Sequence, residues 1–105
     1  MPTGYNKLVR DRIPEIIEEQ DERPVTHVAD DEEYADRLAA KLLEEAREFE
    51  ESRDPEELAD VLEVVDAILE AQNRSRESIE RTRREKRAER GRFEERIVLE
   101  RVEDD

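Results

Sequence analysis

Two pairs of carboxylates have the residue types and the spacing to do chemistry in this chain. Glu45 is followed three residues later by Glu48, and Glu57 is followed three residues later by Asp60. In a helix this spacing puts both members of a pair on one face. Four carboxylates with no histidine or cysteine beside them suit a hard cation. The pattern therefore predicts a site for Mg²⁺, with Mn²⁺ as the second choice.

The helical phase of these acids is stronger evidence for a metal site than their spacing. Charged residues make up 50% of the chain, so acids three residues apart occur easily by chance. On an ideal helix Glu45 falls inside the stripe marked by Leu38 and Phe49, and Glu57 falls inside the apolar arc of the following segment. The second acid of each pair lies at the rim. Burying an unpaired carboxylate is costly, and a bound cation would offset that cost. In the alternative interpretation these acids pair with inward arginines, for which the candidates are Arg10, Arg12 and Arg83.

Apolar periodicity and capping residues predict four helices that position the acids. The expected helices are a short one from about residue 12, two longer ones at about 31–51 and 54–72, and one from about 75 to near 91. The short turn at 52–54 should make the two long helices antiparallel and bring the acid pairs together. Their buried stripes are expected to contain Leu38, Leu42, Ala46 and Phe49 in the first and Leu58, Leu62, Val65 and Leu69 in the second.

Two short apolar segments at 24–28 and 97–99 could form strands that pair with each other. We therefore expect an all-α fold in one domain over residues 1–105. It would be a four-helix bundle with a short N-terminal helix and an optional small two-stranded C-terminal element. Hydrophobic residues make up only 34% of the chain, so the expected core is thin. Association into a homodimer or a larger homo-oligomer would bury more surface.

Composition narrows the classes of function. The net charge of −14 argues against general nucleic-acid binding, which depends on neutralising phosphates. The chain has no cysteine, which excludes a disulfide framework and a thiolate metal site. No apolar run is long enough to span a bilayer, and the N-terminus does not read as a signal peptide. We therefore expect no membrane partner and a cytoplasmic location.

Among the basic residues of the chain, arginine is far commoner than lysine. Only three of the 19 are lysines, and the rest are arginines. An acidic surface with few lysines favours a halophilic protein, because concentrated salt screens its self-repulsion. An ordinary acidic protein from a GC-rich genome is the alternative interpretation.

The fourth expected helix carries a basic stripe. Arg83, Lys86 and Arg90 share the face on which Ile79 lies. In one interpretation these side chains bind the phosphates of a substrate, and a metal ion neutralises part of the same phosphate charge. The other is a solvated helix whose cations pair with neighbouring glutamates.

Four segments resemble the MazG-like branch of the all-α NTP pyrophosphatases, and the similarity spans nearly the whole chain. They are YNKLVRDRIPEII at 5–17, EEARE at 44–48, ELADVLE at 57–63 and KRAERGRF at 86–93. The resemblance implies Mg²⁺-dependent cleavage of a nucleoside triphosphate between its α and β phosphates, which releases a nucleoside monophosphate and pyrophosphate. It also implies house-cleaning of non-canonical nucleotides as a role, and an assembly of two or more copies. Some members of this branch are described as phosphoribosyl-ATP pyrophosphohydrolase-like, but no residue here selects that substrate.

The resemblance also implies roles for individual residues. The metal ligands would be Glu45, Glu48, Glu57 and Asp60. Glu45 and Glu48 would be the catalytic acids, with Glu48 free to take a proton from the attacking water. We expect the phosphates to be bound by Lys7, Arg10, Arg12, Lys86 and Arg90. A non-catalytic acidic helical module, which binds a nucleotide or a protein partner as a regulator, is the competing hypothesis.

Overall fold

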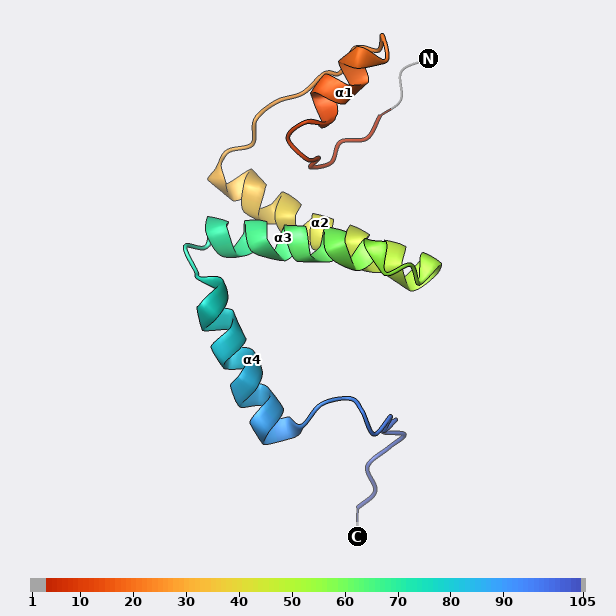
Figure 1. The fold of residues 1–105 in the computed structure, drawn as a ribbon, viewed down its shortest axis with the longest axis vertical. Helices are drawn as coiled ribbons and strands as arrows, with labels where there is room; N and C mark the ends of the chain where they lie inside the picture. Colours follow the sequence, from red (N-terminus) through yellow and green to blue (C-terminus); the bar gives the residue numbers. More distant parts are fainter. Residues whose placement is uncertain (1–3, 105) are drawn as a thin grey trace. The chain divides into compact units, whose positions relative to one another are not determined.

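A computed structural model describes residues 4–104 of the chain, which contain four helices and no strand (Figure 1). The helices are α1 Ile13–Glu19, α2 Asp31–Ser52, α3 Glu56–Ala71 and α4 Arg76–Arg90. The all-α class is confirmed. The two segments expected as optional strands, 24–28 and 97–99, have no strand structure. None of the described helices is long and apolar enough to cross a bilayer.

The described chain forms two compact units that divide between Asn73 and Arg74. The first unit contains α1, α2 and α3, and the second contains α4 and the segment that follows it. Each unit is described by itself below. A single domain over residues 1–105 stays a prediction.

Local signals in the sequence fix the ends of α2 and the start of α3. The side chain of Asp30 accepts a hydrogen bond from the backbone N–H of Glu33 at 2.8 Å, which satisfies a free donor of the first turn. The helix ends at Ser52, and the next residue, Arg53, has a left-handed φ of 60° that turns the chain back. Asp54 then accepts a hydrogen bond from the backbone N–H of Glu56 at 3.0 Å, so it serves the first turn of α3.

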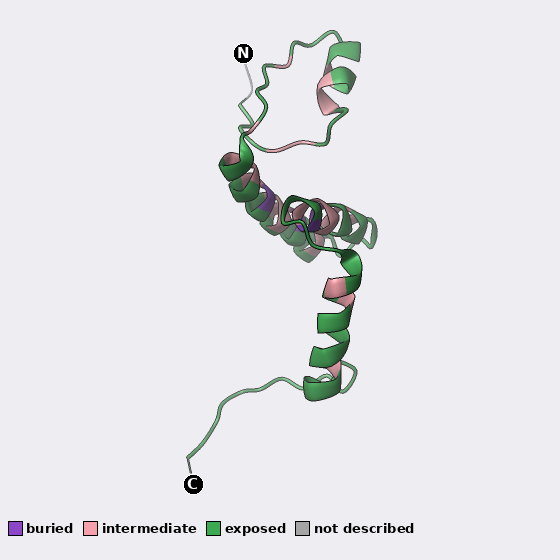
Figure 2. Cartoon of the chain, turned by 90° about the vertical axis from the view of Figure 1, so that its left-hand side faces the viewer, coloured by how far each residue is buried: buried purple, intermediate pink, exposed green. Residues whose placement is uncertain are grey.

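The helices α2 and α3 run antiparallel and pack against each other, as the short turn between them predicts (Figure 1). Figure 2 shows buried residues only on these two helices. The buried apolar side chains are Leu38 of α2 and Val64 and Leu69 of α3. This helix pair is therefore the element of the first unit that can hold a buried functional side chain.

The expected buried stripes were too wide. Leu58 and Leu62 of α3 are 45% and 50% exposed, and Ala46 of α2 is exposed. The physical reason is that the apolar arc of α3 is broader than one neighbouring helix can cover, so only its α2-facing part is buried. The uncovered leucines form an apolar surface on the first unit.

In the second unit, Ser75 and Gly91 delimit α4 as the sequence predicts. The hydroxyl of Ser75 accepts a hydrogen bond from the backbone N–H of Ser78 at 3.1 Å. Gly91 takes a φ of 84°, which an L side chain rarely adopts. No residue of α4 is buried within the described structure. The segment after α4 leaves Phe93, Ile97, Val98, Leu99 and Val102 exposed.

Candidate metal centre

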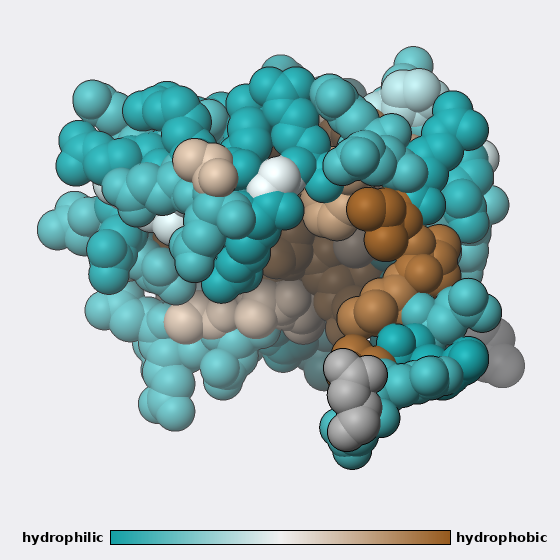
Figure 3. Space-filling model, turned by 90° about the horizontal axis from the view of Figure 1, so that it is seen from below, coloured by the Kyte–Doolittle hydropathy of each residue, from teal (hydrophilic) through white to brown (hydrophobic). Residues whose placement is uncertain are grey.

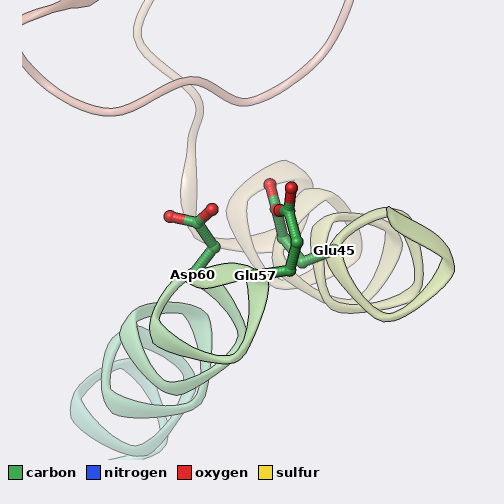
Figure 4. A group of neighbouring side chains, drawn as sticks. All are labelled: Glu45, Glu57 and Asp60. Atoms are coloured by element: carbon green, nitrogen blue, oxygen red, sulfur yellow. The ribbon is translucent and has the colours of Figure 1, made fainter. Parts of the chain in front are cut away.

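Three carboxylates of the first unit converge on one place. Glu45 of α2 and Glu57 and Asp60 of α3 each offer an oxygen, and these oxygens lie within 4.8 Å of one another. Figure 4 shows the three side chains rising from the two helices on the same side. We call Glu45, Glu57 and Asp60 the acidic triad. The spacing of its oxygens is compatible with a single cation held between them.

The antiparallel hairpin is what brings these residues together. Glu45 lies two turns before the end of α2, and Glu57 lies in the first turn of α3. Because the helices run in opposite directions from one short turn, these positions face each other. The start of a helix also carries partial positive charge, which favours a carboxylate at Glu57.

Glu45 is the residue that most needs a cation. It is only 7% exposed, and it is the one buried charged residue among those described. Its Oε2 is buried and has no hydrogen-bond partner. Its Oε1 lies 3.2 Å from Nζ of Lys41. A buried carboxylate oxygen without a partner is rare, so its presence here is an observation that points to a ligand.

The electrostatics of Glu45 agree with this geometry. Burial raises the pKa of Glu45, the ammonium of Lys41 lowers it, and the neighbouring carboxylate of Glu48 raises it. Burial is the largest of these effects. Burial thus disfavours the ionised form even with Lys41 beside it, and a bound cation would favour that form.

Glu48 does not join the acidic triad. It is exposed on α2 and lies outside the group of oxygens within 4.8 Å. It is still close enough to Glu45 to raise the pKa of that residue. The structure therefore brings together three of the four ligands that the sequence predicts and leaves the fourth beside them.

Two of the predicted phosphate-binding residues reach the neighbourhood of the acidic triad. Nη2 of Arg10 donates a hydrogen bond to Oδ1 of Asp60 at 2.7 Å. Nζ of Lys7 donates one to Oε1 of Glu44 at 2.9 Å. The segment before α1 thus contacts both α2 and α3 through basic side chains.

The other predicted basic residues lie elsewhere. Arg12, the residue before α1, is paired with Glu15 of that helix at 3.4 Å. Lys86 and Arg90 are exposed on α4, in the second unit, and their part in phosphate binding stays a prediction. In the alternative, Arg10, Arg12 or Arg83 neutralises the inward acids Glu45 and Glu57, but the arginine contact seen among the described residues is that of Arg10 with the rim acid Asp60. Arg83 pairs with Glu80 at 3.5 Å.

Sequence reasoning missed Lys41 and Glu44. Glu44 accepts hydrogen bonds from both Lys7 and Lys41. Lys41 is also close to Glu45. The signal was available, because Lys41 stands three and four residues before these two acids on one helix. A pocket of about 220 Å³ lies beside Lys7, Lys41 and Glu44. Its other lining residues are Asn6, Leu8, Arg37 and Ala40.

Comparison of the chain with protein-family models, with curated proteins and with solved structures gave no match, so the arrangement of the acidic triad and its neighbours is the basis for the assignment that follows.

Proposed function

We propose that this chain is a Mg²⁺-dependent nucleoside triphosphate pyrophosphohydrolase of the MazG-like branch, acting in the cytoplasm. The observation that carries the proposal is the buried Oε2 of Glu45, which lacks a partner, on a residue whose carboxylate belongs to the acidic triad. A hard divalent cation fits an all-oxygen ligand set of this kind, and Mn²⁺ is the second choice.

Glu45, Glu57 and Asp60 would hold the cation. Three carboxylates leave room in an octahedral shell for water and for phosphate oxygens, which is how proteins commonly bind Mg²⁺. When bound, such a cation offsets the negative charge of the phosphates and makes a coordinated water more acidic.

The chain's own residues would do the remaining work. Glu48 is exposed beside Glu45, where it can accept the proton of the attacking water. Arg10 contacts Asp60 of the acidic triad, and Lys7 contacts Glu44. Each can exchange its carboxylate partner for a phosphate oxygen. Attack at the α phosphorus breaks the bond to the bridging oxygen, which leaves with the β and γ phosphates as pyrophosphate. The other product is the nucleoside monophosphate.

We further propose that the active form is a homodimer or a larger homo-oligomer. Leu58 and Leu62 of α3 and Leu43 of α2 are 45–52% exposed on a helix pair that buries few apolar side chains. Apolar side chains, in brown, are a minority on the mostly hydrophilic face drawn in Figure 3, so an exposed apolar group on the helix pair stands out from its surroundings. A second copy of the same helix pair would supply a complementary apolar face.

The test is a panel of canonical and non-canonical nucleoside triphosphates incubated with the pure chain, Mg²⁺ and concentrated KCl, with pyrophosphate as the readout. We expect Glu45→Gln to abolish pyrophosphate release. Glu51→Gln is the matched control, because Glu51 is exposed on the same helix, and it should stay active. Binding of nucleotides without release of pyrophosphate would instead support a non-catalytic regulatory module.

A further inference from the structure

Lys41 occupies a position that the proposed reaction does not use. Its Nζ lies 2.9 Å from Oε2 of Glu44 and 3.2 Å from Oε1 of Glu45. Its side chain is only 16% exposed, whereas that of Lys7 is 41% exposed. Two carboxylates on the next turn of α2 therefore fix one ammonium group in a partly buried place.

The contact with Lys41 makes the two carboxylate oxygens of Glu45 different from each other. Oε1 is held by the ammonium, and Oε2 is buried without a partner. A carboxylate held in this way can offer one oxygen to a cation. Binding through both oxygens is disfavoured, because the ammonium already uses a lone pair of Oε1 and its positive charge repels a second cation at that oxygen. Glu44 strengthens this arrangement, because it binds the same ammonium at 2.9 Å and keeps it from swinging away.

The number of oxygens that a carboxylate offers matters for the choice of cation. Ca²⁺ takes about six to eight oxygens and often binds a carboxylate through both of its oxygens. Mg²⁺ requires a small octahedral shell and takes one oxygen from each carboxylate, with waters in the remaining positions. A residue that keeps Glu45 to one oxygen therefore favours the smaller ion.

We propose that Lys41 is a positioning residue that makes the acidic triad selective for Mg²⁺ and Mn²⁺ over Ca²⁺. This inference rests on the proposed function, because it takes the acidic triad to be the metal centre. It assigns to Lys41 no contact with the cation or with the substrate. Lys41 acts through Glu45 alone.

The test is calorimetric titration of the metal-free protein, in concentrated KCl, with Mg²⁺, Mn²⁺ or Ca²⁺ alone. In Lys41→Met we expect the affinity for Ca²⁺ to rise about tenfold relative to that for Mg²⁺, the scale on which residues behind a metal ligand act. Lys41→Arg keeps a charged donor and should hold the ratio close to that of the wild type. Lys7→Met removes a lysine that contacts Glu44 but not Glu45, and it should leave the ratio unchanged.

The possible results separate this inference from the function on which it rests. A wild-type chain that binds neither Mg²⁺ nor Mn²⁺ would overturn both. Wild-type binding of Mg²⁺, with the same factor of change for Mg²⁺ and Ca²⁺ in Lys41→Met, would overturn only the role of Lys41. If Lys41→Met loses its helical circular-dichroism signal, Lys41→Gln serves in its place and should raise the ratio in the same direction.

Discussion

Arg10 and Asp60 are 50 residues apart in the chain, yet Nη2 of the arginine donates a hydrogen bond to Oδ1 of the aspartate at 2.7 Å. Asp60 belongs to the acidic triad, so the segment before α1 places a cation directly on a candidate metal ligand. A guanidinium and a divalent cation then compete for the same carboxylate. This competition makes the role of Arg10 measurable.

Replacing Arg10 should have opposite effects on the metal and on the substrate. In Arg10→Gln, Asp60 loses its partner, so the affinity for Mg²⁺ alone should rise by up to about fivefold, which corresponds to the worth of an exposed ion pair. The KM for a nucleoside triphosphate should rise, because a phosphate-binding group is lost. Calorimetry and steady-state kinetics measure the two effects. A KM equal to that of the wild type would remove Arg10 from the phosphate site.

Removing the buried charge of Glu45 should stabilise the metal-free protein. Because Oε2 has no partner, Glu45→Gln replaces an ionised group that is costly to bury with a neutral one. We expect the free energy of unfolding in urea, measured with a chelator present, to rise by about 1 kcal/mol. Added Mg²⁺ should stabilise the wild type and leave Glu45→Gln unchanged. An exposed control, Glu51→Gln, should change neither value, and a clear loss of stability in Glu45→Gln would argue that its carboxylate is already satisfied.

Glu44 should make the fold sensitive to acid. The hydrogen bond from Lys7, and then that from Lys41, lowers the pKa of Glu44 below the usual 4.5. A folded-state pKa below the unfolded value means that ionised Glu44 stabilises the fold above about pH 4.5. This contribution is lost as the pH falls through the folded-state pKa. Urea unfolding at neutral and acidic pH should therefore show Glu44→Gln less stable than the wild type only at neutral pH. An equal difference at both values would contradict the prediction.

The exposed leucines of α3 should hold the assembly together. Leu62→Glu places a charge on an apolar side chain that is 50% exposed in the single chain. We expect the mass measured by light scattering to fall from that of an oligomer to that of a monomer, with the helical content retained. Val28→Glu is a matched control, because Val28 is 97% exposed in the connector before α2. An unchanged mass for Leu62→Glu would place the contact between copies elsewhere.

Salt should govern folding. With a net charge of −14 and only three lysines, the folded chain repels itself unless counter-ions screen it. Circular dichroism across a KCl series should show helical signal rising with salt and cooperative melting only at the high end. A chain that is fully folded without salt would contradict the halophilic interpretation and leave the GC-rich alternative.

The sequence alone determined the local structure of this protein. Asp30 and Ser75 accept the N-terminal hydrogen bonds of α2 and α4, and Gly91 ends α4, because capping depends on residues within one turn. Apolar periodicity placed Glu45 on the inward face of α2, and the short turn predicted the antiparallel pair. These inferences hold because they use contacts between neighbours in the chain.

Only the tertiary structure decided which charges meet. Helical phase could not exclude Glu48 from the acidic triad, because its exposure depends on where α3 lies beside α2. It could not choose Asp60 as the partner of Arg10, since half of all side chains in the chain are charged and many acids could serve an exposed arginine equally well. Pairing between distant charges is weak and non-directional in water, so it follows the packing of the helices.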